Sequence, residues 1–140
     1  MDFDSNLTVM VVDDNQSLRR TIGDILRAVG LSSQVQAEDG LAAWKKLQDT
    51  QVDLIILDWD MPNMNGMELL EKIRQANDRF GQIKVLMLTA HATRNDVMEA
   101  IHKGAQDYVV KPFSPDTLYA KLNKLLKSRD DLQATLVGEP

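Results

Sequence analysis

The stretch that decides the fold is LIILDWDMPNMNG, residues 54–66, in which four apolar residues are followed directly by Asp58. An apolar run flanked by Asp53 and Asp58 and followed by Pro62 and Gly66 is typical of a buried strand that leaves a sheet into a loop. A carboxylate at the end of such a strand is partly desolvated, which is costly unless a cation or a hydrogen-bond donor lies nearby. The sequence therefore predicts that Asp58 has a partner.

Apolar runs and helical patterns alternate along the chain. Strands are predicted at residues 7–12, 33–37, 54–57, 83–88 and 107–110. A helix is predicted after each strand from the helical spacing of its apolar residues, and three helices begin with capping patterns: Asn65 with Glu68, Thr93 with Asp96, and Ser114 before Pro115. Five strand and helix pairs favour an α/β fold, with a doubly wound, five-stranded parallel sheet and five helices on both faces.

Length and composition limit the chain to one compact domain and exclude several classes of protein. The chain has 140 residues, of which 44% are hydrophobic, and this size suits one domain with its own core. The formal net charge of -5 argues against direct binding to nucleic acid, because such binding needs a basic face. No cysteine occurs, so disulfides and thiolate metal sites are excluded.

The ends of the chain carry weaker signals. The start, MDFDSN, lacks the basic and apolar segments of a signal peptide, and no apolar run approaches the ~18 residues of a membrane span. We therefore expect no membrane insertion and a cytoplasmic location. The helical pattern weakens after Lys127, so residues 128–140 are expected to extend the last helix or to be disordered.

Polar residues gather where the predicted strands end. In parallel sheets of this kind, ligands bind at the carboxyl ends of the strands. The residues found there are Asp13 and Asp14, Asp58 and Asp60, Thr89, and Lys111. Carboxylates about 4 Å apart repel by roughly 4 kcal/mol at an effective dielectric constant of 20, so an ionised cluster binds a cation or takes up protons. Oxygen ligands with open positions suit Mg²⁺.

The same edge also carries groups for an anion. Lys111 supplies a second positive charge and Thr89 a hydroxyl donor for an anion held by the metal. The set therefore suits phosphoryl transfer, with Asp58 as the nucleophile. Taken singly, each residue also has a structural explanation: an Asp pair as a helix cap, a Thr with strand propensity, or a solvated Lys. Lys121, Lys124 and Lys127 are expected to form the solvated face of the last helix.

Four motifs in this order and spacing carry a family resemblance: VVDD (11–14), LDWDMPNMNG (57–66), MLTA (87–90) and YVVKPF (108–113). They resemble the receiver domain of two-component response regulators, most closely the stand-alone chemotaxis regulators of the CheY type. The resemblance covers about residues 5–127. It implies the flavodoxin-like strand order 2-1-3-4-5, a cis peptide between Lys111 and Pro112, and Asp58 as the phosphoacceptor.

The resemblance also implies roles for the surrounding residues. Asp13, Asp14 and Asp58, with the backbone of Asp60, would hold Mg²⁺. Thr89 and Lys111 would contact the phosphoryl group, and Tyr108 would change rotamer on activation. Asp60 and His91 stand at positions that tune the lifetime of the phosphoryl group in this family, and both depart from the residues common in chemotaxis regulators, which are Asn and an acidic residue.

The expected protein is a single-domain response regulator in chemotaxis or a related two-component phosphorelay. It would be a signalling phosphoprotein that catalyses its own phosphorylation and dephosphorylation, with no other enzymatic activity. Its expected partners are a sensor histidine kinase, a target such as a flagellar motor switch component, and a phosphatase. The alternative is a haloacid-dehalogenase-like phosphatase that uses the Asp58/Asp60 pair, although such enzymes carry this pair on their first strand. A flavodoxin-like electron carrier is disfavoured because no Ser/Thr-rich phosphate loop follows the first strand.

Overall fold

A five-stranded parallel sheet forms the centre of the computed structural model, which describes residues 3–126. The strands are β1 (Thr8–Val12), β2 (Ser33–Ala37), β3 (Leu54–Asp58), β4 (Lys84–Thr89) and β5 (Asp107–Val110). Their order is β2-β1-β3-β4-β5, and all four pairings are parallel. The doubly wound fold and its strand order are thus confirmed. The expected tail at residues 128–140 lies outside the described residues.

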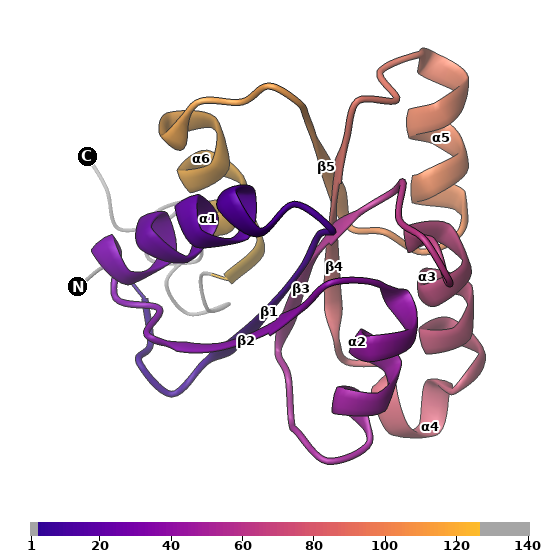
Figure 1. Cartoon of the computed structure of the whole chain (residues 1–140), viewed down its shortest axis with the longest axis horizontal. Coiled ribbons are helices and arrows are strands. Elements are labelled where there is room, and N and C mark those ends of the chain that lie inside the picture. Colours follow the sequence, from indigo (N-terminus) through magenta and orange to yellow (C-terminus); the bar gives the residue numbers. More distant parts are fainter. Residues whose placement is uncertain (1–2, 127–140) are drawn as a thin grey trace, which may run out of the picture.

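Six helices cover the two faces of the sheet within residues 3–126. They are α1 (Gln16–Ala28), α2 (Gly40–Leu47), α3 (Gly66–Gln75), α4 (Asn77–Phe80), α5 (Arg94–His102) and α6 (Pro115–Leu126). Helices α1 and α6 lie on one face, and α2 to α5 lie on the other (Figure 1). Each of these helices is too short or too polar to serve as a membrane span.

The alternation of side chains along the strands explains this layering. Successive residues of a strand point to opposite faces, so each strand of a covered sheet must be apolar on both. In β3, Ile55 and Leu57 pack in the core under α2 to α5, while Leu54 and Ile56 pack in the core under α1 and α6. All four side chains are buried. The run LIIL, residues 54–57, therefore contributes to both cores.

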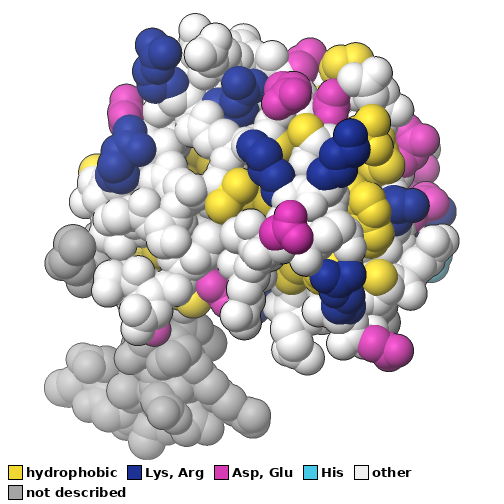
Figure 2. Space-filling model, turned by 60° about the horizontal axis from the view of Figure 1, so that its bottom comes forward, with side chains coloured by type: hydrophobic (Ala, Val, Ile, Leu, Met, Phe, Trp, Pro, Cys, Tyr) yellow, Lys and Arg dark blue, Asp and Glu magenta, His cyan; other side chains and the backbone are white. Residues whose placement is uncertain are grey.

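Helix α4 is the one helix of residues 3–126 that was not predicted from the sequence. It has four residues, which is too short to show an apolar period. Phe80, its last residue, is buried and meets Trp44 of α2 edge to face, with 5.5 Å between the ring centroids. Lys72 lies over Trp44 and Arg79 over Phe80. Figure 2 brings this lower side of the molecule forward and shows basic side chains beside hydrophobic ones.

The three predicted capping patterns are confirmed. The Asn65 side chain accepts a hydrogen bond from the Glu68 amide at 2.9 Å, within a full capping box. Thr93 accepts from the Asp96 amide, and Ser114 accepts from the Thr117 amide. Because caps fix where a helix begins, they set the length of each loop that follows a strand. These loops carry the residues of the site.

Candidate functional site

Three carboxylates meet where β1 and β3 end. Asp13 follows β1 and is fully buried, Asp58 is the last residue of β3 and is 4% exposed, and Asp14 is exposed. One oxygen of each lies within 4.8 Å of the other two. Opposite ligands of Mg²⁺ stand about 4.2 Å apart, at twice the usual metal–oxygen distance of about 2.1 Å, so three oxygens within 4.8 Å of one another are near the spacing that one such ion needs. The oxygen-only donor set also suits a hard cation.

Lys111 places its ammonium between two of these carboxylates. Its Nζ donates to Asp13 Oδ2 at 2.9 Å and to Asp58 Oδ1 at 3.1 Å. The backbone N–H of Lys111 donates to the Thr89 carbonyl, and the Lys111–Pro112 peptide is cis, as expected. Asp58 therefore has the cationic partner that its burial requires, but it shares that partner with Asp13.

Because Lys111 also pairs with Asp13, its charge compensates the Asp58 carboxylate only in part. Burial, and then the neighbouring Asp13 carboxylate, raise the pKa of Asp58 to about 6, although Lys111 acts in the opposite direction. Burial alone would lower the pKa of Lys111, but hydrogen bonds and charges from Asp13 and then Asp58 together outweigh burial and raise that pKa. The site thus has a protonated lysine and a carboxylate whose ionised form any further cation would stabilise.

Close backbone packing holds the loop after Asp58. The N–H of Gly66 donates to the Trp59 carbonyl at 2.9 Å. A Cβ at Gly66 would stand 2.2 Å from the backbone oxygen of Asp58, so only glycine allows this approach. The start of α3 is consequently pressed against the backbone of the candidate nucleophile, which limits movement of that residue.

Thr89 ends β4, next to the strand that carries Asp58. It is 2% exposed, and its Oγ1 accepts a hydrogen bond from the His91 amide at 2.8 Å. A hydroxyl has one donor in addition to its acceptor positions, so Thr89 retains a hydrogen that it can donate to an anion. Parallel pairing places Asp58 beside Leu88, one residue before Thr89. The two predicted site residues are therefore neighbours at the same edge.

Asp60 and His91 form a bridge between the loops after β3 and β4. His91 Nε2 is 2.7 Å from Asp60 Oδ2, and the His91 ring stacks on Trp59 with 4.5 Å between centroids. Asp96, in the first turn of α5, lies 3.7 Å from His91 Nδ1. The Asp60 carboxylate is 69% exposed and points to this histidine, outside the cluster of three acids. The stacking of Trp59 and His91 was not predicted, because 32 residues separate them in the sequence. The Asp96 contact is local, but it depends on where the His91 ring points, which the sequence does not give.

Tyr108 lies on edge strand β5, beside Met87 of β4, and is half-buried. Its neighbour Asp107 is buried and receives hydrogen bonds from Lys121 at 2.9 Å and Lys124 at 3.0 Å. The expected solvated face of the last helix is therefore only partly correct. The Lys124 side chain is 67% exposed, but that of Lys121 is 29% exposed because it reaches Asp107. Lys127 lies outside the described residues.

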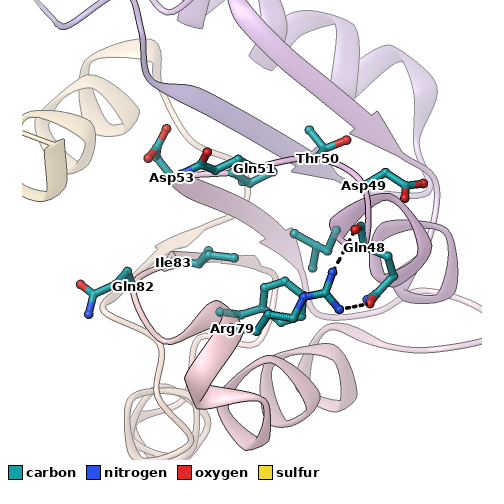
Figure 3. Close-up of a pocket in the computed structure, with 11 residues that line it drawn as sticks. Gln48, Asp49, Thr50, Gln51, Asp53, Arg79, Gln82 and Ile83 are labelled. Carbon is teal, nitrogen blue, oxygen red and sulfur yellow. Dashed lines mark hydrogen bonds between the residues drawn. The ribbon is translucent and has the colours of Figure 1, made fainter.

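A separate cavity of about 470 Å³ opens near the amino ends of β3 and β4, between the loop before β3 and the end of α4. Figure 3 shows Arg79 reaching across it, with hydrogen bonds to the side chain and the carbonyl of Gln48. Asp53, which lines it, precedes β3, whereas Asp58 ends that strand. Five residues of strand span about 16 Å, so this cavity is not part of the carboxylate site.

Comparisons with known proteins agree with this geometry. A family model described as the response regulator receiver domain matches residues 9–123. The chain is 38% identical over 122 residues to the chemotaxis protein CheY-3 of Vibrio cholerae, which covers 87% of this chain and 93% of that protein. It is 39% identical over 127 residues to the chemotaxis protein CheY1 of Helicobacter pylori, covering 89% of this chain and 100% of the relative.

Solved structures give the same picture. The chemotaxis response regulator CheY4 of Vibrio cholerae superposes with a TM-score of 0.79 at 33% identity, over 86% of this chain and 98% of that one. The receiver domain of a Francisella response regulator superposes with a TM-score of 0.78 at 31% identity, over 86% and 96% of the two chains.

Proposed function

The chain belongs to the response regulator receiver domain family, and on that premise we propose that it accepts a phosphoryl group on Asp58 from a sensor histidine kinase and signals through a change in its affinity for a target protein. The observation that carries this proposal is the position of Asp58, buried at the end of β3 with Lys111 at 3.1 Å and with Asp13 and Asp14 close enough to share a cation. The phosphatase alternative is not favoured by the family match.

The proposed reaction exchanges one bond at phosphorus for another. A carboxylate oxygen of Asp58 attacks the phosphorus of a phosphohistidine that is protonated on its other ring nitrogen; the P–N bond breaks, and neutral imidazole leaves with the electron pair. Lys111 then turns from Asp58 to an oxygen of the bound phosphoryl group, and Thr89 donates its hydroxyl hydrogen to another. Asp13, Asp14 and Asp58, with the backbone of Asp60, would hold Mg²⁺, which when bound supplies positive charge to the phosphoryl oxygens.

The test is labelling with acetyl phosphate and Mg²⁺, read by intact mass. One phosphoryl group is expected on the parent protein and none on Asp58→Asn. Asp53→Asn is the matched control, since it removes a carboxylate at the opposite end of β3, outside the site, and should label like the parent. Labelling of Asp58→Asn to the parent level would place the acceptor elsewhere. Continuous turnover of an added phosphomonoester would favour the phosphatase instead.

Metal binding has its own readout, because Trp59 adjoins Asp58. A Mg²⁺ titration should change tryptophan emission in a Trp44→Phe variant, whose only tryptophan is Trp59. In the Asp13→Asn form of that variant, the same change should need a much higher Mg²⁺ concentration. An emission trace that stays flat throughout would contradict a metal site at these residues.

The proposed signalling surface consists of α5, β5 and α6, with Tyr108 at its centre. Three exposed hydrophobic side chains on α5 and β5 support it: Met98, Ile101 and Val110. Thr89 leads into α5 and Lys111 ends β5, so a phosphoryl group held by both would act on both elements. Amide shift mapping with and without beryllofluoride, followed by target binding of Tyr108→Ala, tests this surface.

The partners and setting proposed here follow from the named relatives. As chemotaxis proteins are among them, we propose a target such as a flagellar motor switch component, a cytoplasmic location, and a phosphatase as a further partner. The Asp60–His91 bridge supports a role for both residues in the lifetime of the phosphoryl group. Decay of labelled Asp60→Asn and His91→Ala, timed by mass, should differ from decay of the parent.

A further inference from the structure

Tyr108 is held at both its backbone and its ring by one ion pair. The Tyr108 amide donates to Asp107 Oδ1 at 2.8 Å, and Lys121 Nζ donates to the same oxygen at 2.9 Å. The Lys121 ammonium also lies 5.3 Å from the centroid of the Tyr108 ring. An ammonium within about 6 Å of an aromatic ring is attracted to its face. The position of the ring therefore depends on where Asp107 keeps Lys121.

The ion pair is well fixed at its acidic end. Asp107 is 6% exposed, and although burial alone would raise its pKa, hydrogen bonds from Lys121, the Tyr108 amide and Lys124 bring that pKa below its ordinary value. The two lysines differ in their surroundings. Lys121 is largely covered and faces the ring, whereas Lys124 is 67% exposed, bonds the other carboxylate oxygen, and has no described contact with Tyr108.

We propose that Lys121 is a positioning residue that holds the Tyr108 ring in one orientation, with Asp107 as its anchor, and thereby sets how readily Tyr108 changes rotamer. The inference rests on the proposed function for its consequence, because a rotamer change signals only if this surface binds a target. A ring that turns away from Lys121 loses this contact. Any ligand that turns the ring must supply that difference.

The expected size follows from the strength of such contacts. A cation on an aromatic ring at a partly exposed site changes an equilibrium by roughly two- to fivefold. Lys121→Met keeps the aliphatic stem and removes the ammonium, so it deletes the contact with the ring together with the ion pair to Asp107. Lys124→Met deletes only an ion pair to Asp107 and so separates the two effects. We expect Lys121→Met to raise the ratio of the alternative Tyr108 rotamer to the present one by roughly two- to fivefold.

The experiment is NMR of the full chain with ring-labelled tyrosine and no phosphoryl mimic. Tyr119→Phe serves as the background in every sample, because it leaves Tyr108 as the only tyrosine and keeps the aromatic contact with Phe3. Side-chain couplings then report the rotamer ratio. Lys121→Met and Asp107→Asn should both shift it, and Lys124→Met, which also removes a lysine from Asp107, should leave it unchanged.

An unchanged ratio in Lys121→Met, or an equal shift in Lys124→Met, would overturn the inference. Because the resting protein is measured, this result does not depend on whether Asp58 is the acceptor. A second titration with beryllofluoride and Mg²⁺ separates the two proposals. Half-maximal change of the Tyr108 signal is expected at a roughly two- to fivefold lower concentration in Lys121→Met. A parent protein that does not respond would count against the proposed function, and the resting ratio would still decide the role of Lys121.

Discussion

Asp58 and Asp107 are buried carboxylates of the same sheet, 4% and 6% exposed, in opposite charge environments. Asp58 shares the single ammonium of Lys111 with Asp13, and its pKa is raised to about 6, first by burial and then by the Asp13 charge. Asp107 has two ammonium groups to itself, and its pKa is lowered despite its burial. Burial is therefore similar at the two acids, and the number of cations for each carboxylate separates a site that attracts a cation from a structural ion pair.

The largest effect is expected from removing the cation that Asp13 and Asp58 share, which is Lys111. Lys111→Met leaves buried carboxylates without a counter-charge, and we expect it to lower the free energy of unfolding by about 4 kcal/mol at pH 8 without metal. At pH 5 the loss should be smaller, because Asp58, with a pKa of about 6 in the parent, is then protonated. Urea unfolding at both pH values measures this. An equal loss at both would indicate lost packing of the lysine stem.

Removing the charge of Asp58 itself should have the opposite sign. The folded pKa of about 6 exceeds the ordinary value of 3.8, so between these values the folded state binds more protons than the unfolded state. The stabilisation by this group is complete below about pH 3.8 and is lost as the pH rises through about 6. Asp58→Asn should therefore raise the free energy of unfolding by about 3 kcal/mol at pH 8 without metal.

The pH profile of that variant provides its control. The fall in stability between pH 4 and 6 in the parent should be smaller in Asp58→Asn, and saturating Mg²⁺ should stabilise the parent alone. A variant that is less stable than the parent at pH 8 would contradict the assigned charge imbalance.

Asp107→Asn should lower the free energy of unfolding, whereas Asp58→Asn should raise it. Its lowered pKa means that the ionised form stabilises the fold above the ordinary pKa, and this contribution is lost as the pH falls through the lowered value. We expect a loss of about 2 kcal/mol at pH 7, the worth of hydrogen bonds to a charged group. Thermal unfolding at pH 7 and pH 3 should show the difference between variant and parent narrowing at low pH.

The smallest effect is expected from Lys124→Met. Its side chain is 67% exposed and Asp107 retains Lys121, so the change in unfolding free energy should be at most about 0.5 kcal/mol. Urea unfolding at low and high salt measures it. A loss comparable to that of Asp107→Asn would mean that both lysines are needed, and the comparison of one cation with two would have to be revised.

Asp58 and Asp107 also differ in how far the sequence predicts their partners. Asp58 was predicted to have a cation or a hydrogen-bond donor as its partner, because a buried carboxylate at the end of a strand is costly without one. Parallel strands bring their carboxyl ends to one edge, and this rule brought Asp13, Asp14 and Lys111 to Asp58. Asp107 begins its strand, and its two lysines come from helix α6, so the alignment of strand ends does not predict them.

The remaining contacts depend on packing between elements. Lys121 reaches Asp107 because α6 lies against β5 in one rotation, which helical spacing alone does not determine. His91 meets Asp60 only through the shapes of two loops. Helix α4 is a single turn fixed by the burial of Phe80 against Trp44, and one turn carries too few residues for a periodic pattern. These features become visible once side chains are placed in three dimensions.

The Asp107 ion pairs also bear on how the protein behaves at high concentration. Within residues 3–126, β5 pairs only with β4 and β2 only with β1, so in this part of the chain each has one free edge that another chain could extend into a larger sheet. β5 has four residues, and Asp107 with its two lysines places charges at the start of that edge. β2 carries Ser33, Gln34 and Gln36 among its five residues. Short length, charge and polar side chains are the means by which proteins avoid edge-to-edge aggregation, so the same ion pairs that surround Tyr108 help to keep separate copies of the chain apart.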